Sequence, residues 1–508
     1  MNDATPLHWH AVAPALIVLG GTVAVLCAEA FLRPRSSILG RRLSESWRVT
    51  FLGTVVVVTL TVALLTAVDQ WRGGGYASLL SKQPMLRIDR LASFGACLVL
   101  AATLLASAFS LTSLAERNRQ TGAHFALLLI SLVGMLIVQS ATHLVSLFVG
   151  IELACLPLYA VLGLENDRLS GVEGGLKAFF HGSVASAVML YGFVLLYGAT
   201  GTMSYPGLRD ALSGNAGPLA TLGTGLTVVG FAAKVGWVPF HAWSPDAQQG
   251  ASPGAAIQLG VALRCAMLIG LLRLLTDAFG VTEDGALLPR VFWTLAALSM
   301  IVGAAMANLQ KNLVRMYAYA GIAHLGLMSI GLATITRASF GALLFYLMSF
   351  TFATLGSFAV IAALSRRGRG ELRVEDLRGL AHRQPVLAGF MTLFCISLAG
   401  FPGTAGFVSR LYVFTSAVDA GVIVLNLIAL MCTLILALLY VRIVATMYAG
   451  ESGASSPVSR VSSGEGLALA ACGFAAVVFG LFPNAGSAGW LAWLRAIDWT
   501  QASVAFLF

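Results

Sequence analysis

The chain has 508 residues, of which 58% are hydrophobic and only 10% are charged, and its mean hydropathy is +0.85. Soluble domains carry about 25% charged residues, and no soluble domain of this length hides so many apolar side chains from water. These values exclude a soluble enzyme, and the formal net charge of +9 indicates basic loops on one side of a membrane rather than a nucleic-acid partner. We therefore predict an all-α polytopic membrane protein.

Roughly fourteen apolar segments are long enough to cross a bilayer, since a spanning helix needs about 20 residues. The expected spans are residues 10–32, 50–68, 91–114, 122–141, 142–163, 173–200, 219–241, 255–278, 290–309, 316–336, 338–364, 386–418, 421–449 and 465–486. The N-terminus lacks the basic region of a signal peptide, so the first segment is expected to remain as a span. No long hydrophilic stretch separates the spans, which predicts a single membrane domain over residues 1–508 with no soluble catalytic module.

Arginine-rich loops give the expected orientation. Arginines cluster in the loop after the first span and in the loop before the twelfth. Both are odd-numbered connections, so they lie on one side, and the excess of positive charge identifies that side as cytoplasmic. Both termini then lie outside. The loop at residues 69–90 also carries basic residues and is the main exception.

Cofactor-binding motifs are missing from the sequence. All seven cysteines lie in apolar segments without a C-x-x-C pair, which is typical of small buried residues rather than of an iron–sulfur or zinc site. The chain also has no P-loop, dinucleotide fingerprint or H-E-x-x-H motif. We expect no metal, nucleotide or redox cofactor on this chain.

Two of the apolar segments are interrupted by glycine and proline. The first reads GFAAKVGWVPFHAWSPD at residues 230–246, and the second reads LAGFPGTAGFVSRLYVF at residues 398–414. Backbone groups freed at membrane depth are satisfied only inside protein or around a wet cavity. Paired breaks of this kind are typical of transporters built from inverted repeats.

The two breaks, five helices apart, predict the internal organisation of the chain. We expect one inverted repeat over residues 122–278 and a second over residues 290–449. Residues 1–121 then form three N-terminal helices, and residues 450–508 form a C-terminal helix and tail.

Two opposite charges lie deep in apolar sequence. Glu152 is enclosed by the apolar stretch LFVGIELACLPLY, and Lys234 precedes the first break. A charge near the middle of a span costs roughly 2.5–3.5 kcal/mol, so each residue is the natural partner of the other. We predict a pair in which Lys234 exchanges a proton while Glu152 tunes its affinity for that proton. A static structural ion pair is the alternative.

Other ionisable residues have two open interpretations each. Lys177 either lies beside the predicted pair or extends its side chain toward the membrane interface. His181, one helical turn later, either relays protons or packs in the helix. His324, in MYAYAGIAHLGLMSIGL, belongs either to a proton path or to helix packing. His241 either lines a wet cavity or caps carbonyls freed by the first break.

Three arginines also lie in spans. Arg264 and Arg410 are expected to be deep, whereas Arg273 is near a helix end and is expected at the membrane interface. Arginine keeps its proton in the physiological range. We therefore expect Arg264 and Arg410 to act as fixed charges along an internal polar axis.

Several motifs together resemble the antiporter-like membrane subunits of respiratory complex I. The resemblance covers about residues 90–450 in order. The motifs are GIELACLPLYAVLGL, GLKAFFHGSVASAVMLYGFVLLYGATG, GFAAKVGWVPFHAWSPDAQQGASP, NLVRMYAYAGIAHLGL, VEDLRGLAHRQP and LAGFPGTAGFVSRLYVF. Within the family, two motifs, ELxxLPLY and LKxFFxGxxxSAxxLYG, most resemble those of subunit N of the bacterial NADH–quinone oxidoreductase.

The resemblance implies fourteen helices with two inverted five-helix repeats and broken helices seven and twelve. It implies proton translocation coupled at a distance to quinone reduction, in a bacterial inner membrane, beside other membrane subunits such as M and K. NADH, FMN, iron–sulfur clusters and quinone would then belong to partner subunits. By motif, Glu152 matches the helix-five glutamate, Lys177 the helix-six lysine and Lys234 the helix-seven lysine.

The chain departs from the family pattern at three positions. Arg264 stands where the family usually has the helix-eight lysine, and Arg410 where it has the helix-twelve lysine. Gly403 replaces the second proline of the usual G-I-P-P break. These differences leave three alternatives open: an Mrp-type cation/proton antiporter subunit, a membrane subunit of a hydrogenase-like complex with an impaired proton path, and a structural paralogue.

Overall fold

The computed structural model describes residues 9–32, 45–76, 85–117, 121–164, 169–213, 217–280, 287–365, 372–450, 463–484, 496–505 and 507. The chain forms two compact units. Unit 1 comprises Met1–Val235 and Gly250–Gly280, and unit 2 comprises Gly236–Gln249 and Val281–Phe508. The change of unit after Gly280 falls between the two predicted repeats, but the inverted repeat itself stays a prediction.

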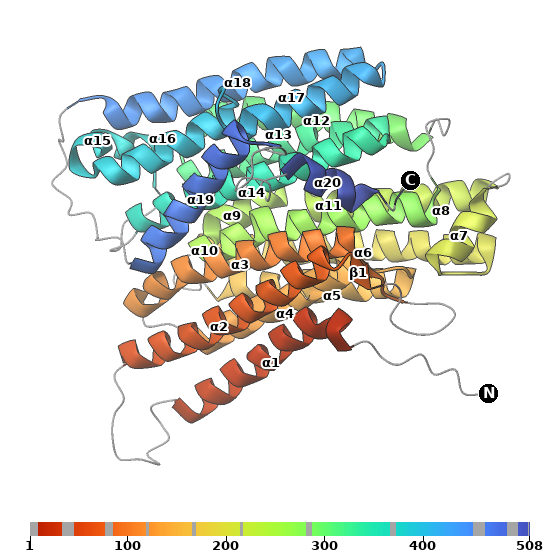
Figure 1. Ribbon diagram of the computed structural model, residues 1–508, viewed down its shortest axis with the longest axis horizontal. Helices are drawn as coiled ribbons and strands as arrows, with labels where there is room; N and C mark the ends of the chain where they lie inside the picture. Colours follow the sequence, from red (N-terminus) through yellow and green to blue (C-terminus); the bar gives the residue numbers. More distant parts are fainter. Residues whose placement is uncertain are drawn as a thin grey trace. The chain divides into compact units, whose positions relative to one another are not determined.

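Unit 1 is a helical bundle in which long apolar helices run side by side (Figure 1). Its helices are α1 (Trp9–Leu32), α2 (Glu45–Arg72), α3 (Arg90–Arg117), α4 (Thr121–Ser140), α5 (Leu144–Gly163), α6 (Leu169–Thr200), α7 (Tyr205–Leu212), α8 (Pro218–Val235), α10 (Pro253–Ile257) and α11 (Leu263–Arg273). Two π-helical turns flank α11, η2 (Gln258–Ala262) before it and η3 (Leu274–Ala278) after it. A two-residue antiparallel ladder joins β1 (Gly75–Tyr76) to β2 (Ile88–Asp89).

Unit 2 contains the remaining helices. They are α9 (Trp243–Gly250), α12 (Leu287–Leu309), α13 (Leu313–Thr334), α14 (Arg337–Leu364), α15 (Leu380–Arg383), α16 (Pro385–Ala399), α17 (Ala405–Asp419), α18 (Ile423–Tyr448), α19 (Ser463–Leu481) and α20 (Ala496–Val504), with a 3-10 turn η4 (Val374–Leu377). A capping box fixes the start of α14, where Thr336 and Ser339 satisfy each other's backbone N–H groups. The short helices α7 and α20 were not predicted from the sequence.

Thirteen helices in the described part of the chain are long and apolar enough to cross a membrane. The predicted twelfth span is divided into α16 and α17, each of 15 residues, and neither alone reaches the roughly 20 residues of a span. The prediction of an all-α polytopic membrane protein is therefore confirmed. Two further features, the π-helical turns and the short ladder, carry no signal in the hydropathy pattern.

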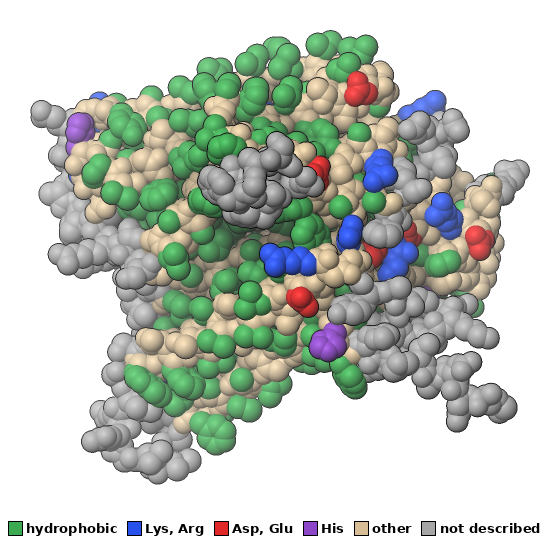
Figure 2. Space-filling view, viewed as in Figure 1, with side chains coloured by type: hydrophobic (Ala, Val, Ile, Leu, Met, Phe, Trp, Pro, Cys, Tyr) green, Lys and Arg blue, Asp and Glu red, His purple; other side chains and the backbone are tan. Residues whose placement is uncertain are grey.

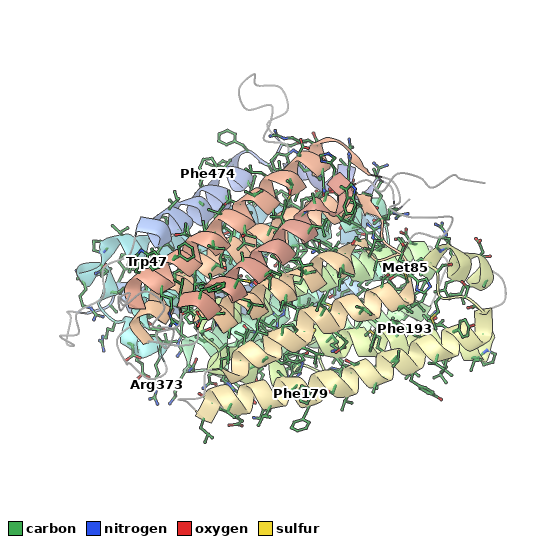
Figure 3. The ribbon with its side chains drawn as sticks, turned by 90° about the horizontal axis from the view of Figure 1, so that it is seen from below. Trp47, Met85, Phe179, Phe193, Arg373 and Phe474 are labelled. Carbon is green, nitrogen blue, oxygen red and sulfur yellow. The ribbon has the colours of Figure 1, made fainter. Side chains whose placement is uncertain are left out.

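Burial separates inner helices from those that face lipid. The spanning window is wholly buried in α13 and over Pro253–Ala278, whereas only 33% of it is buried in α1, α6 and α18. Figure 2 shows hydrophobic side chains over much of the described surface on one face of the protein. On α6, Phe179 projects outward while Phe193 is buried (Figure 3). This pattern is expected where lipid rather than water surrounds the protein.

Each glycine- and proline-rich segment lies between two helices, and whether the flanking helices form one broken span stays a prediction. Helix α8 ends at Val235, and Gly236 then adopts the left-handed conformation with φ 86°. Helix α16 ends at Ala399, and Gly400 follows with φ 83°. Only glycine adopts such angles without steric cost, which explains why each helix stops there.

Side chains of unit 2 satisfy polar groups at the first break. The Val238 backbone N–H donates to the Ser299 hydroxyl at 3.0 Å, and the Trp237 indole N–H donates to the Ser329 hydroxyl at 2.7 Å. The neighbouring proline, Pro239, has no N–H to satisfy. The irregular backbone is thereby held inside protein, as it must be at membrane depth.

An ion-pair cluster in unit 1 surrounds Arg273. Arg273, expected at the interface, has a fully buried side chain that pairs with Asp89 at 2.6 Å and Asp277 at 3.6 Å. Arg87 pairs with the same two carboxylates. The guanidinium also donates to the Gln139 carbonyl at 3.0 Å. Arg273 is buried because these partners, remote in sequence, replace water around its charge.

We predict that Asp89→Asn destabilises the protein by about 3–5 kcal/mol, because it leaves the buried Arg273 charge without its nearest partner. Thermal unfolding of the purified protein in detergent measures this effect. Asp210→Asn, which changes an exposed carboxylate on α7, is the matched control and is expected to be near neutral. An Asp89→Asn protein as stable as the native protein would contradict the assignment.

The same cluster predicts a pH dependence. Burial raises the pKa of Asp89, but the Arg273 charge and hydrogen bond, with further help from the Ala92 N–H and Arg87, outweigh burial and leave the pKa below its usual value. A depressed pKa stabilises the fold above the unfolded value of about 3.9, and this contribution disappears as the pH falls through the folded value. The stability difference between the native protein and Asp89→Asn should therefore shrink as the pH is lowered from about 5 to about 3. Unfolding measured across this range tests the sign, and a constant or growing difference would refute it.

Candidate functional site

The predicted Glu152–Lys234 pair forms in unit 1. The Lys234 ammonium lies 2.9 Å from the Glu152 carboxylate, and the lysine side chain is 0% exposed while the glutamate side chain is 20% exposed. Lys234 is in the last turn of α8, where the negative end of the helix dipole favours a cation. The structure thus places a fully enclosed amine in direct contact with a partly exposed acid.

Two further residues complete the surroundings of this pair. Ser186 of α6 donates its hydroxyl hydrogen to the same Glu152 oxygen that receives Lys234. The Lys234 ammonium lies 5.9 Å from the centre of the Tyr159 ring, within range of a cation–π attraction. Tyr159 lies seven residues after Glu152, so both project from one side of α5. The site therefore draws on α5, α6 and α8.

Close packing of α5 against α6 depends on a small residue. A Cβ atom added at Gly182 would lie 2.5 Å from the Tyr159 hydroxyl oxygen. Small residues let helices approach closely in membranes, and Ser186, one turn after Gly182, then reaches the carboxylate. Sequence reasoning missed Ser186 and Tyr159. The SxxSAxxLY pattern of small residues in the sixth span was a signal for such a contact.

The two basic residues of α6 have different surroundings. Lys177 pairs with Glu173 at 2.6 Å, and its side chain is 44% exposed. This geometry favours the exposed-lysine interpretation, although the role proposed for Lys177 stays a prediction. His181 is half-buried and hydrogen-bonds the Ala233 backbone carbonyl, the residue before Lys234. His181 therefore reaches the lysine-bearing turn of α8.

In unit 2, His324 lies at the centre of a buried polar cluster. Its Nδ1 is 2.9 Å from the Tyr346 hydroxyl, and its Nε2 is 3.0 Å from the Tyr440 hydroxyl. All three residues are almost completely buried. A histidine between two phenols can pass a proton by exchanging donor and acceptor roles, so both of the interpretations left open for His324 fit this arrangement.

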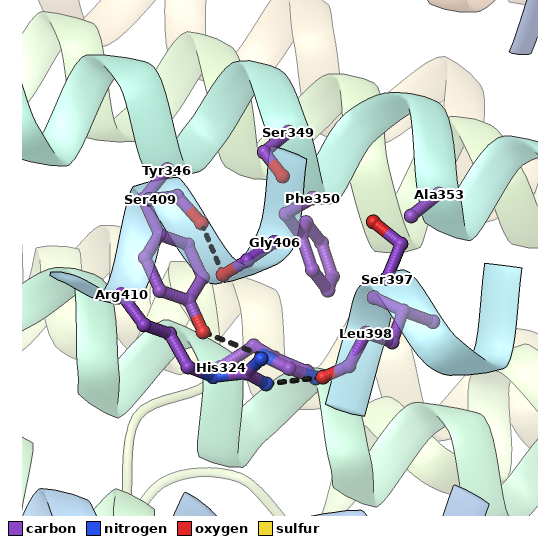
Figure 4. Close-up of a pocket in the computed structure, with 10 residues that line it drawn as sticks. All are labelled: His324, Tyr346, Ser349, Phe350, Ala353, Ser397, Leu398, Gly406, Ser409 and Arg410. Carbon is purple, nitrogen blue, oxygen red and sulfur yellow. Dashed lines mark hydrogen bonds between the residues drawn. The ribbon is translucent and has the colours of Figure 1, made fainter. Parts of the chain in front are cut away.

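Arg410 lies beside this cluster, next to the second break. Its guanidinium donates to the Leu398 carbonyl at the end of α16 and contacts the Tyr346 hydroxyl (Figure 4). A small cavity adjoins it, lined in part by His324 and Ser397. Arg410 is thus buried, and its depth in the membrane stays a prediction.

Arg264 and His241 occupy the positions their sequence context indicated. Arg264 is buried in α11, directly after the η2 turn. His241 is partly exposed and hydrogen-bonds the Pro239 carbonyl. The centre of its ring lies 6.2 Å from the centre of the Tyr319 ring. For His241 this favours the alternative in which it caps a carbonyl freed by the break.

One ion pair in unit 2 was not predicted. Arg315, at the start of α13, pairs with Asp246 in the first turn of α9 and donates to the Gln249 amide oxygen at 3.0 Å. The guanidinium also lies 5.8 Å from the centre of the Tyr319 ring. Asp246 closes the first broken segment, and an acid directly after a break was the available signal for a partner.

Comparison with known proteins assigns the chain to a family. The family described as NADH:quinone oxidoreductase/Mrp antiporter, TM, matches residues 141–436. Subunit N 1 of the NADH-quinone oxidoreductase of Sorangium cellulosum is 34% identical, covering 93% of this chain and 96% of the relative. Subunit N from Mycobacterium tuberculosis is 33% identical over 95% of this chain and 97% of the relative.

Solved structures agree with this assignment. A chain of respiratory complex I from Thermus thermophilus with bound aureothin superposes with a TM-score of 0.75 at 28% identity, covering 92% of this chain and 97% of that one. A chain of the Mrp complex from a Dietzia species has a TM-score of 0.80 at 22% identity, covering 97% and 98%, and this likeness concerns the fold alone. The resemblance inferred from the motifs is confirmed, and the chain belongs to the NADH:quinone oxidoreductase/Mrp antiporter family of transmembrane proteins, among which the subunit N proteins are its relatives.

Proposed function

We propose that this chain is a proton-translocating membrane subunit of an NADH–quinone oxidoreductase in a bacterial inner membrane. The observation that carries the proposal is the contact between the Lys234 ammonium and the Glu152 carboxylate inside the helical bundle. Quinone reduction, with NADH, FMN and iron–sulfur clusters, takes place on partner subunits, and this chain carries no redox centre. Its neighbours are other membrane subunits, M and K among them.

The pair works through the energy of its Coulomb attraction. Two unit charges about 4 Å apart attract by about 4 kcal/mol at an effective dielectric constant near 20. An energy of about 4 kcal/mol changes proton affinity roughly a thousandfold. Drawing the Glu152 charge away from Lys234, or neutralising it, therefore releases the lysine proton. Restoring the contact lets Lys234 take up another.

Ser186 gives the carboxylate a second stabilising partner in this cycle. Its hydroxyl donates to the Glu152 oxygen that also receives Lys234. When the lysine loses its proton, the hydrogen bond still compensates part of the buried carboxylate charge. The partial exposure of the Glu152 side chain gives this group, rather than the enclosed lysine, access to charges on neighbouring molecules.

Four other ionisable residues take part in the proposed proton transfer. Lys177 holds a proton near the exposed part of α6, where it pairs with Glu173. His324 passes protons between Tyr346 and Tyr440 in unit 2. Arg264 and Arg410 are fixed charges, because a guanidinium keeps its proton. They bias the proton affinity of neighbouring groups without handing on protons themselves.

We predict that Lys234→Ala in the assembled complex abolishes most proton pumping into vesicles and lowers the coupled oxidoreductase turnover, because the proton-exchanging amine is lost. Pumping is followed with a pH-sensitive dye and turnover with NADH and a soluble quinone. Lys311→Ala, at an exposed lysine before α13, is the matched control and should pump as the native complex does. Unchanged pumping by an assembled Lys234→Ala complex would leave only a structural role for the pair.

We predict that Arg410→Lys pumps at least as well as the native complex, since it keeps the positive charge and adds a group that can exchange a proton. Arg410→Leu should pump several-fold more slowly because the charge is gone. The same vesicle measurement compares the two variants at equal assembly. Equal loss of pumping in both would show that the guanidinium shape, and not its charge, matters at this position.

A further inference from the structure

Arg410 differs from two other buried basic residues, Lys234 and Arg273, in the partners of its charge. Lys234 and Arg273 each contact a carboxylate. Arg410 is only 4% exposed, yet within the described ranges it forms no ion pair with any carboxylate. Its interactions are the Leu398 carbonyl and the Tyr346 hydroxyl, both of which are uncharged. A buried cation costs several kcal/mol unless a counter-charge compensates it, so the site calls for an anion.

The guanidinium also has hydrogen-bond donors to spare. Its Nε and Nη1 atoms are buried and have no hydrogen-bond partner in the part of the chain that the structure describes. The Ser397 hydroxyl, 0% exposed, is likewise buried without a partner there. Native proteins satisfy the great majority of such groups. Two neighbouring side chains with unused donors indicate a ligand that accepts hydrogen bonds.

A cavity lies where these donors meet. Arg410, Ser397, Ser349 and Phe350 are among its lining residues (Figure 4). Its volume of about 10 Å³ is room for roughly one water-sized particle. The cavity therefore has room for a small particle, and the buried guanidinium beside it favours one with negative charge.

The local helix geometry adds to the preference for negative charge. Gly406, in the first turn of α17, also lines the cavity. A Cβ atom there would lie 3.3 Å from the Ser397 hydroxyl oxygen, so that hydroxyl lies against the first turn of the helix. The N-terminal turn of a helix carries unpaired N–H groups and the positive end of the dipole. A helix start, a buried guanidinium and a hydroxyl donor thus converge on one small space.

We infer that this cavity binds one small monovalent anion of the halide class, with Arg410 as its counter-charge and Ser397 as a hydrogen-bond donor. The anion neutralises Arg410 and links the end of α16 to the start of α17 across the second break. The titratable groups that face the site are His324 and Tyr346. The inference goes beyond the proposed proton translocation and does not depend on it.

Bromide and chloride are the probes that test this site. The purified complex is prepared in gluconate, which is too large to enter the cavity, and halide is then added. Crystals soaked in bromide should show an anomalous scattering peak between the Arg410 guanidinium and the Ser397 hydroxyl. Thermal unfolding should shift upward with chloride concentration relative to gluconate at equal ionic strength.

Variants separate a specific site from a general salt effect. Arg410→Gln should abolish the bromide peak and the chloride-dependent shift. Ser397→Ala, a milder change that keeps the charge, should raise the chloride concentration for half of the shift by roughly fivefold, the effect of one hydrogen bond worth about 1 kcal/mol. Arg442→Gln, at an exposed arginine of α18, is the matched control and should bind as the native complex does.

Three results would overturn the inference. They are a water molecule at the site in both bromide and gluconate, a native complex whose stability is the same in chloride and gluconate, and a Ser397→Ala complex with native chloride dependence. If Arg410→Gln fails to assemble, Ser397→Ala and the bromide map decide the question. Since halide binding is measured without turnover, its failure would leave the proposed proton translocation intact, and the reverse also holds.

Discussion

The structure depends on how an ionised side chain is stabilised when it is buried inside the helical bundle. Burying one ion costs several kcal/mol, and a partner of opposite charge recovers that energy only when it is in contact. Lys234 and Glu152 meet this condition at 2.9 Å. The fully enclosed Lys234 has Glu152 as its carboxylate partner, and Glu152 also accepts a hydrogen bond from Ser186. Under the proposed function, this contact lets the pair move protons, whereas a static ion pair would only join the helices.

Two buried pairs in unit 1 solve the same electrostatic problem with different consequences. Arg273 has two carboxylate partners and a carbonyl, and its guanidinium keeps its proton at any physiological pH. That cluster therefore acts as structure, joining β2 to the end of the eighth predicted span. Lys234 has one carboxylate partner, and an ammonium can lose its proton when that partner withdraws. In the proposed function, the choice of lysine over arginine therefore separates a site that exchanges protons from a permanent link.

The main features of the site were predictable from the sequence because lipid imposes strict limits. A glutamate or lysine enclosed by apolar residues must find a partner, and glycine with proline must interrupt a helix. Both arguments are local, and they located Glu152, Lys234 and the two breaks. Helix ends followed from hydropathy to within a few residues.

The remaining contacts were out of reach because they join distant parts of the chain. Arg273 and Asp89 are 184 residues apart, and Arg315 and Asp246 are 69 apart. The sequence around each of these four residues does not indicate which distant residue is its partner. The Tyr346 and Tyr440 contacts of His324 depend likewise on helix packing. The exposure of Lys177 depends on which face of α6 is covered, and an almost uniformly apolar helix does not reveal that face.

The two breaks resemble each other in sequence but differ in electrostatics. Lys234 stands in the last turn of α8, before the break, where the negative end of the helix dipole favours a cation. Arg410 stands in α17, after the break, near a helix start whose dipole favours an anion. At the first break, the Lys234 ammonium is thus stabilised by the end of α8 and by the Glu152 carboxylate. The second break places the Arg410 guanidinium between the Leu398 carbonyl at the end of α16 and the start of α17, with no carboxylate in contact among the described residues, and the proposed anion would supply the missing counter-charge.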